Sequence, residues 1–204
     1  MKARTALGLV LAGLWVILGQ AVASAGTPTD VVRKMLDDVM IIQSNPELQG
    51  QESRATRKAG VKKVILANFN FDDMARQALG QQWNNLDGAK RSEFKSIFQD
   101  LFLDSYTRLV LDFLKKEKIV YVSEDGGQDR ATVKTLIQRV NEEIPVDYFL
   151  MQAQGRLRVR DVSIDGVSIV GNYEKSFSRI IKQESYQSLL KKMKLQREAM
   201  DKAT

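Results

Sequence analysis

The sequence predicts an α+β protein with a four-stranded antiparallel sheet surrounded by helices. Apolar residues recur at helical spacing up to about residue 113, at a spacing near two between residues 118 and 164, and at helical spacing again from Ile169. The strand segments follow one another with short turns, which is typical of an antiparallel meander rather than of a parallel sheet. Because no internal repeat or linker is visible, we expect one domain over residues 26–204.

The helices expected before the sheet are bounded by capping and breaking residues. Thr27-Pro28 favours the start of a first helix, and Ser44-Asn45-Pro46 ends it. A second helical pattern runs from about residue 52 to 69. A short third pattern over residues 72–79 ends at Gly80, as expected for a glycine after a helix.

The longest helical pattern follows Asp87, which is its expected N-cap. Its apolar stripe consists of Phe94, Ile97, Phe98, Leu101, Phe102, Tyr106, Leu109, Val110 and Phe113. We expect this helix to lie at the centre of the core.

The strands are separated by turns that contain glycine. A first strand includes residues 119–122, and Gly126-Gly127 is a hairpin turn before a second strand over residues 131–140. Residues 144–154 and 156–164 form the third and fourth strands, and they meet at Gly155. Asp165-Gly166 ends the sheet, and helical spacing returns in one late stretch through Ile169, Tyr173, Phe177, Ile180, Ile181, Leu189, Leu190 and Met193.

The N-terminus has the three parts of a secretory signal peptide. Lys2 and Arg4 precede an uncharged apolar run over residues 6–19, and Ala23-Ser24-Ala25 follows as a small-residue cleavage site. The run is shorter than the roughly 20 residues that span a bilayer, so we predict a cleaved signal peptide over residues 1–25. Since the chain has no cysteine for disulfides, we expect an exported protein of the bacterial envelope that is stabilised by its core alone.

The composition excludes several catalytic mechanisms. The 204 residues include no His and no Cys, so a Ser-His-Asp triad, a thiol nucleophile and a His/Cys zinc site are absent. The acidic pairs, such as Asp37-Asp38 and Asp72-Asp73, are adjacent in sequence, and their side chains therefore diverge instead of sharing a proton. We expect no enzymatic activity, no cofactor and no nucleic-acid partner.

A surplus of large apolar side chains on facing elements is the first candidate binding feature. It consists of Phe94, Phe98, Phe102 and Tyr106 on the long helix, Tyr121, Val146, Tyr148 and Leu150 on strands, and Ile169, Tyr173 and Phe177 on the late helix. Periodicity alone favours a packed core, since aromatic stripes commonly pack helices on sheets. These side chains could therefore form either a packed core or the wall of a pocket, and both alternatives stay open.

A row of arginines is the second candidate. Arg156, Arg158 and Arg160 alternate with Leu157 and Val159, which predicts three guanidinium groups on one face of one strand. A solvated outer face is the simpler interpretation, and a surface for an anion or an acidic partner is the more specific one. A weaker candidate is the basic group near the C-terminus, formed by Lys191, Lys192, Lys194 and Arg197, which suits either a charged helix end or anionic lipid headgroups.

Several segments carry a family pattern. Residues 71–83, FDDMARQALGQQW, match Phe-x-x-Met-Ala-x-x-x-Leu-Gly-x-x-Trp, and Arg91-x-x-Phe94-x-x-x-Phe98, Val146-Asp147-Tyr148 and residues 161–173, DVSIDGVSIVGNY, follow in order. In these segments the chain resembles the MlaC-like proteins, the toluene-tolerance auxiliary family of periplasmic phospholipid carriers. Leu157 and Glu174 depart from the pattern, because the family commonly has Trp and Arg there.

The resemblance implies a twisted sheet and helices that enclose an apolar pocket for acyl chains, with the headgroup near solvent. It implies a soluble periplasmic carrier that shuttles phospholipid between an inner-membrane ABC transporter with its MCE-domain protein and an outer-membrane lipoprotein complex. The surplus of apolar residues would then line the pocket, and the three arginines would meet headgroups or partners. We expect such a carrier to be a monomer with phospholipid as its cargo.

Two other functions are compatible with the residues. An enzyme with a pocket between a curved sheet and helices would need a buried acid or base, for which Asp147 and Asp161 are the candidates. An envelope adaptor that binds only protein would have a tightly packed core. Phospholipid bound to the purified protein would distinguish the carrier from both.

Overall fold

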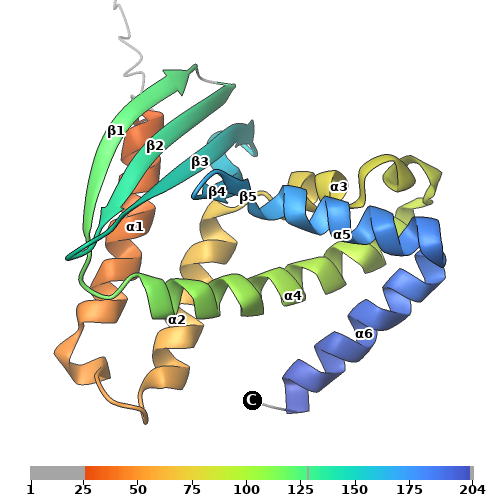
Figure 1. Cartoon of the computed structure of the whole chain (residues 1–204), viewed down its shortest axis with the longest axis horizontal. Helices are drawn as coiled ribbons and strands as arrows, with labels where there is room; N and C mark the ends of the chain where they lie inside the picture. Colours follow the sequence, from red (N-terminus) through yellow and green to blue (C-terminus); the bar gives the residue numbers. More distant parts are fainter. Residues whose placement is uncertain (1–25, 128, 203–204) are drawn as a thin grey trace, which may run out of the picture.

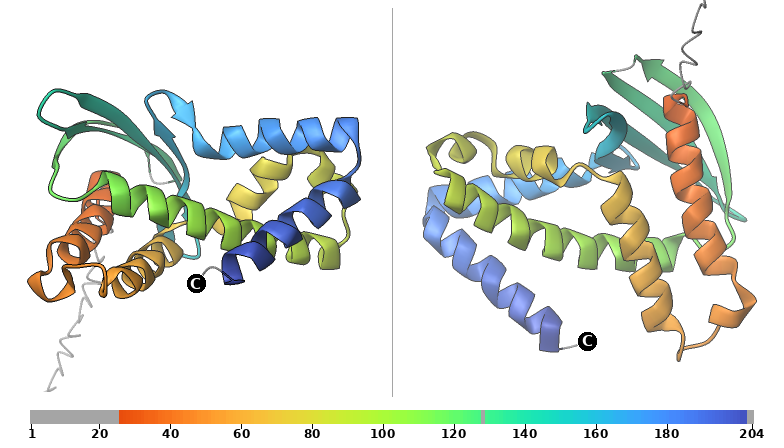
Figure 2. Two further views of the ribbon diagram at one scale, coloured as in Figure 1. Left: turned by 60° about the horizontal axis from the view of Figure 1, so that its bottom comes forward. Right: turned by 180° about the vertical axis from the view of Figure 1, so that it is seen from behind.

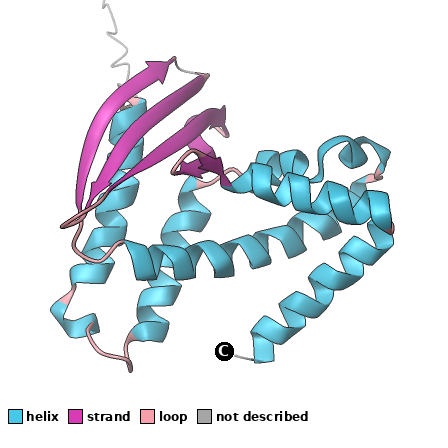
Figure 3. Ribbon diagram, viewed as in Figure 1, coloured by secondary structure: helices cyan, strands magenta, loops and turns pink. Residues whose placement is uncertain are grey.

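An antiparallel meander forms the sheet of the computed structural model, which describes residues 26–127 and 129–202. The predicted signal peptide, residues 1–25, lies outside the described residues. The strands pair in sequence order and are β1 (Lys118–Gly126), β2 (Arg130–Gln138), β3 (Glu143–Ala153), β4 (Arg156–Ile164) and β5 (Val167–Ser168) (Figure 3).

The α+β class is confirmed, but the prediction of four strands is wrong because β5 adds a fifth. Ser168 and Val167 of β5 pair with Ser163 and Ile164 of β4 across the turn at Asp165-Gly166. Both turn residues have positive φ, 50° and 75°, which suits glycine and is tolerated by aspartate. A two-residue strand is too short for any alternation of polar and apolar residues, so periodicity could not reveal it.

Six α-helices and two 3₁₀ turns accompany the sheet in the described chain. They are α1 (Pro28–Ser44), η1 (Pro46–Leu48), α2 (Arg54–Asn68), α3 (Phe71–Leu79), η2 (Gly80–Asn85), α4 (Gly88–Phe113), α5 (Ile169–Gln183) and α6 (Tyr186–Lys202). Thr27 caps α1 in a capping box with Asp30, and Asp87 caps α4 by accepting a hydrogen bond from the Lys90 amide at 2.8 Å.

The late helical stretch is two helices rather than one. The Ser185 hydroxyl accepts a hydrogen bond from the amide of Ser188 at 3.1 Å, so it stabilises a new helix start after α5 has ended at Gln183. Figure 1 shows the resulting corner, where α6 turns back beneath α5 and runs along α4.

The helices lie on the concave side of the sheet and extend beyond it. α1 crosses the inner face of β1 and β2, α2 runs antiparallel beside α1, and α4 passes below the sheet (Figures 1 and 2). The N-terminal half of α4 is surrounded by α3, α5 and α6, whereas its C-terminal half approaches the inner face of the sheet. Among the described helices, none is long and apolar enough to cross a membrane.

The inner face of the sheet follows from strict alternation along the central strands. In β2 and β3 alternate residues are buried, including Val133, Ile137, Val146 and Tyr148, while residues such as Lys134 point outward. This buried row continues the core formed by the phenylalanines of α4, so sheet and helices share one hydrophobic cluster.

A parallel bridge joins the helical part to the fourth strand. Phe69, directly after α2, pairs with Val159 of β4, and the amide of Asn70 donates to the Val159 carbonyl at 2.7 Å. Asn70 also caps α3, because its side chain accepts a hydrogen bond from the amide of Asp73. The α2–α3 connection is therefore fixed directly to the sheet.

Candidate functional site

A small apolar cavity lies between the C-terminal half of α4 and the inner face of the sheet. Its volume is about 20 Å³. Its walls come from α4 and the end of that helix, and from β2, β3 and β4: Tyr106, Leu109, Val110, Phe113, Leu114, Ile137, Val146, Tyr148 and Ile164. We call this site the apolar cavity.

The sequence places these side chains together through two periodicities. Tyr106, Leu109, Val110 and Phe113 recur at three- and four-residue intervals, so they share one face of α4. Across the sheet, Ile137 pairs with Ile144, and Val146 pairs with Ile164, which aligns inward side chains of neighbouring strands. Leu109, Phe113 and Ile164 are partly exposed and form the rim of the apolar cavity.

Two tyrosines, Tyr106 and Tyr148, belong to this wall. Burial raises the pKa of Tyr106 and Tyr148, so both phenols stay protonated at neutral pH. Within residues 26–127 and 129–202 neither hydroxyl has a hydrogen-bond partner. Both phenols are therefore uncharged hydrogen-bond donors without a partner in the described part of the chain.

The predicted aromatic residues of the long helix form a continuous row of rings in contact. Phe94, Phe98, Phe102 and Tyr106 follow one another with centroid distances of 6.1, 5.9 and 5.3 Å. Tyr173 of α5 packs against Phe98 at 5.3 Å. Phe94, Phe98 and Phe102 are at most 1% exposed, so these three rings form the core between α4 and α5.

Three of the predicted pocket residues line the apolar cavity, namely Tyr106, Val146 and Tyr148. Phe177 contacts Phe94 and Tyr173 in the α4–α5 core, and Leu150 and Ile169 also belong to or pack against the core. Tyr121 of β1 is half-buried beneath the guanidinium group of Arg33, 4.0 Å from its ring centroid. The predicted residues are thus distributed between the apolar cavity and the surrounding core.

The prediction missed six residues of the wall: Leu109, Val110, Phe113, Leu114, Ile137 and Ile164. A signal for three of them was present, because Leu109, Val110 and Phe113 continue the apolar stripe of the long helix. That stripe has no feature to show where the core ends and a cavity begins.

The three predicted arginines contact the α2–α3 connection. Arg156 donates to the Ala67 carbonyl at 2.6 Å, and Arg160 Nε lies 2.8 Å from the carboxylate of Asp73. Arg158 donates to Gln154 at 2.9 Å and lies 3.5 Å from the Phe69 carbonyl. The guanidinium groups thus attach β4 to the helices, although Arg156 itself is exposed.

The basic group near the C-terminus is partly neutralised. Lys192 pairs with Glu184, while Lys194 and Arg197 pair with Glu93 and Asp100 of α4 at 2.6 and 3.6 Å. These ion pairs hold α6 along α4. Such surface pairs contribute little stability individually.

Asp161 and Asp147, the candidate catalytic acids, lie at structural positions. Asp161 accepts hydrogen bonds from the amides of Val162 and Val170 at 2.8 and 3.0 Å and from the Ser168 hydroxyl, so it holds the start of α5. Asp147 lies on the outer face of β3, opposite Lys134 of β2. No cluster of His, Cys, Asp or Glu among the described residues could hold a metal ion.

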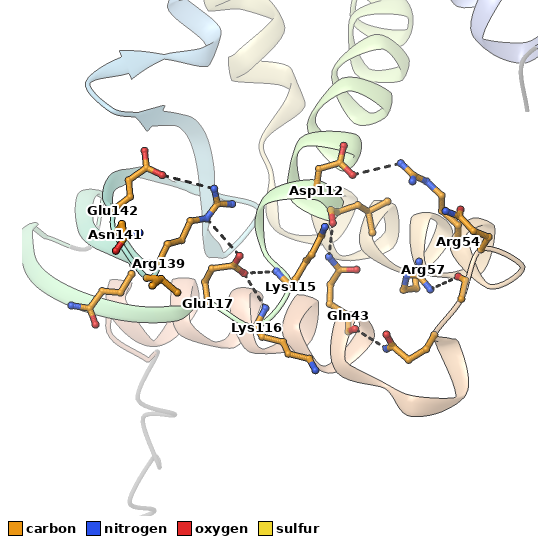
Figure 4. Close-up of a pocket in the computed structure, with 16 residues that line it drawn as sticks. Gln43, Arg54, Arg57, Asp112, Lys115, Lys116, Glu117, Arg139, Asn141 and Glu142 are labelled. Carbon is orange, nitrogen blue, oxygen red and sulfur yellow. Dashed lines mark hydrogen bonds and ion pairs between the residues drawn. The ribbon is translucent and has the colours of Figure 1, made fainter.

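A second, polar cavity of about 1000 Å³ lies beyond the C-terminal end of α4. Its wall comes from the end of α1, the start of α2, the α4–β1 connection and the β2–β3 turn (Figure 4). Its charged side chains are Arg54, Arg57, Lys115, Lys116, Arg139, Asp112, Glu117 and Glu142. We call this site the basic basin, because five positive groups face three negative ones.

The geometry defines a class of protein: an antiparallel meander with helices on its concave side, built around an apolar interior. The chain belongs to the MlaC family, since the family model described as MlaC protein matches residues 33–195. The resemblance recognised in the sequence is therefore confirmed. No curated protein sequence matches the chain.

A solved structure shares this fold. It is the phospholipid-binding protein from Ralstonia solanacearum in complex with a phospholipid, with a TM-score of 0.71 and 18% sequence identity. The match covers 84% of this chain and 96% of that chain. The similarity therefore extends over nearly the whole architecture described above.

Proposed function

We propose that this protein is a phospholipid carrier that holds acyl chains between α4 and the concave face of the sheet. The observation that carries the proposal is the apolar cavity, whose wall consists of aliphatic and aromatic side chains from α4, β2, β3 and β4. Membership in the MlaC family and the shared fold with a phospholipid-binding protein support it.

Burial of acyl chains is the physical task of such a carrier. A diacyl lipid alone in water exposes about 30 methylene groups, and at about 0.8 kcal/mol each the gross penalty is on the order of 25 kcal/mol. An apolar interior removes most of this penalty, as a bilayer does. The free-energy change for moving a lipid from a bilayer into the protein is therefore close to zero. The direction of lipid transport must then be set by the donor and acceptor partners.

Entry of a chain requires movement of the cavity wall. A volume of about 20 Å³ accommodates roughly one water-sized probe. Leu109 and Phe113 are partly exposed at the rim, and we propose that rotation of these side chains opens the apolar cavity. The sheet and α4 then separate further as the chain enters.

We base a proposed cellular role on the family resemblance. The proposed carrier is exported by a signal peptide over residues 1–25 and works in the periplasm as a monomer. It moves phospholipid between an inner-membrane ABC transporter with an MCE-domain protein and an outer-membrane lipoprotein complex. Of the three predicted arginines, Arg156 is the most exposed and the best placed to contact a partner.

Native mass spectrometry of protein purified without added lipid tests the proposal. We expect a stoichiometric adduct of phospholipid mass, which solvent extraction then identifies. A bare polypeptide mass that persists after incubation with phospholipid vesicles would overturn the carrier function and favour an adaptor that binds only protein.

A pair of tryptophan variants tests the position of the chains. Leu109→Trp enlarges a side chain at the rim of the apolar cavity, whereas Ile41→Trp enlarges one on the outer surface of α1, where Ile41 is 67% exposed. We expect Leu109→Trp to reduce bound lipid about tenfold, as an overpacking penalty of about 1.4 kcal/mol implies. Equal loading of both variants would place the acyl chains elsewhere.

A further inference from the structure

The basic basin contains positive charges that lack acidic partners. Asp112 pairs with Arg54 at 3.6 Å, while Glu117 and Glu142 lie 3.6 and 4.0 Å from Arg139. The three carboxylates of the basin therefore pair with only two of its five cations, Arg54 and Arg139. Arg57, Lys115 and Lys116 have no carboxylate partner in the described part of the chain.

The backbone holds one of these cations in place. The Arg57 guanidinium donates to the carbonyls of Leu48 and Gly50, and these neutral acceptors leave its charge uncompensated. The side chains of Lys115 and Lys116 are exposed on the α4–β1 connection, whose amides are fixed by the Glu117 carboxylate. The basin therefore combines one oriented guanidinium with the ammonium groups of two exposed lysines (Figure 4).

The basic basin and the apolar cavity meet at the last turn of α4. Phe113 and Leu114 line the apolar cavity, whereas Leu111, Asp112 and Lys115 of the same segment line the basin. Arg139 connects the two sites: its guanidinium lies 4.1 Å from the centroid of the Phe113 ring and donates to the Phe113 carbonyl at 2.9 Å. An amphiphile with its tails in the apolar cavity can thus place its polar end in the basin.

We propose that the basic basin binds the phosphate group of the phospholipid whose acyl chains occupy the apolar cavity. This inference rests on the proposed carrier function and adds the position of the headgroup. A phosphate offers several acceptor oxygens and a negative charge, which suits a guanidinium and two ammonium groups in a site open to water.

The basin is a different place from the arginines of β4. Arg54 and Arg57 lie in the first turn of α2, whereas Arg156 contacts Ala67 near the last turn of that helix. At 1.5 Å per residue, the two ends of α2 are about 20 Å apart. A headgroup in the basin therefore leaves Arg156 free for contacts with a partner.

Competition between two lipids with identical tails tests the proposal. The purified protein is incubated with dioleoylphosphatidylglycerol vesicles that contain dioleoylglycerol, and native mass spectrometry measures the ratio of the two lipids bound. We expect wild-type protein to enrich the phospholipid over the diacylglycerol. Lys115→Gln/Lys116→Gln should lower this ratio about tenfold, since each exposed ion contact contributes roughly two- to fivefold.

The control variant is Lys175→Gln/Lys182→Gln. Both lysines are exposed on α5, away from the basin, and the double substitution changes the net charge by the same amount. It should keep the wild-type ratio, and high salt should lower the ratio of wild-type protein because the basin is open to water. An unchanged ratio in Lys115→Gln/Lys116→Gln would overturn the proposal.

A second measurement separates the lipid headgroup from free phosphate. Inorganic phosphate is titrated into wild-type protein and Lys115→Gln/Lys116→Gln while the amide NMR signals of residues 115–117 and 139 are followed. One outcome is that phosphate causes saturable shifts in wild-type protein but not in the variant, while the protein binds neither lipid. This result would indicate a site for free phosphate and would overturn the carrier function alone. If no shifts occur and the protein binds both lipids equally, the proposed phosphate site in the basic basin would be overturned, while the proposed carrier function would remain.

Discussion

Asp73 joins α3 to β4 through one buried carboxylate. It is 5% exposed, accepts a hydrogen bond from Gln77 at 2.6 Å and pairs with Arg76 of its own helix and with Arg160 of β4. Burial raises the pKa of this carboxyl, but the bonds from Arg76 and Arg160 outweigh burial and hold the pKa below its ordinary value of 3.8.

Asp73→Asn should therefore change how stability depends on pH. A carboxyl whose pKa is lowered by folding stabilises the protein above its ordinary pKa, and this stabilisation is lost as the pH falls through the folded-state value. We expect the variant to be less stable by about 2 kcal/mol at pH 7 and to lose less stability than wild type between about pH 4 and pH 2.

Urea denaturation at several pH values measures this difference. Asp37→Asn, at an exposed position of α1, is the control and should follow the wild-type curve. Parallel curves for wild type and Asp73→Asn would show that the Asp73 network does not depend on ionisation.

Tyr148→Phe should separate ligand binding from stability. Its hydroxyl has no protein partner among the described residues, so removal should leave the free energy of unfolding nearly unchanged. The loss of a hydrogen-bond donor to a lipid ester should weaken lipid retention about threefold to tenfold, measured by transfer to acceptor vesicles.

Tyr173→Phe is the matched control for this variant. The Tyr173 hydroxyl bonds to Ser105, so its removal should lower stability without a specific effect on lipid retention. Equal retention in Tyr148→Phe and wild type would show that the Tyr148 hydroxyl does not contact the lipid.

At the residue scale the sequence identified the apolar interior but not its division into core and cavity. Phe98 and Tyr106 lie two turns apart on the same stripe of α4, yet Phe98 packs against Tyr173 whereas Tyr106 reaches the apolar cavity. The difference depends on α5 covering one half of α4 and the sheet approaching the other. The positions of α5 and the sheet relative to α4 do not affect the spacing of apolar residues along α4, so the sequence pattern of this helix cannot reveal them.

At the scale of elements, a glutamine from α1 closes the C-terminal end of α4. The Gln43 side-chain amide donates to the carbonyls of Leu111 at 3.1 Å and Leu114 at 2.6 Å. These carbonyls belong to the last turn, where a helix lacks internal partners. Gln43 is also one of the residues that line the basic basin.

Gln43→Met should loosen this end of α4 while it keeps a side chain of similar length. We expect the last-turn amides, including Leu114, to exchange with deuterium about tenfold faster, as the loss of about 1.4 kcal/mol of local stability implies. Ser44→Ala is the control, because the Ser44 hydroxyl bonds within α1 to Met40. Equal exchange in both variants would mean that packing alone holds the helix end.

The elements themselves were largely predictable because their ends have local causes. Asp87 begins α4, Gly80 follows α3 with a φ of 57°, and β4 spans Arg156–Ile164 as expected. The separation of α5 from α6 was missed because Leu189 and Met193 keep helical spacing with α5. Ser185 interrupts the helix through a capping bond, which is a weaker sequence signal than proline or glycine.

At the scale of the whole molecule, a bound lipid should stabilise the fold by filling its interior. A ligand that binds the folded state raises stability by about 2.7 kcal/mol at a hundredfold excess over its Kd. We expect delipidated protein to melt at a temperature lower by about 5–10 °C, measured by calorimetry before and after solvent extraction and refolding. Identical melting before and after lipid removal would contradict lipid burial between α4 and the sheet.

The bridge between Phe69 and Val159 has a consequence for how the chain folds. The four long strands pair through short connections, so the sheet has mostly local contacts, and α1 to α4 also form consecutively. The bridge instead closes a loop that contains all of α4 and most of the sheet, and loop closure of that length carries a large entropic penalty. The helical and sheet halves should therefore acquire their own structure early, and their docking at Phe69 and Val159 should set the height of the folding barrier.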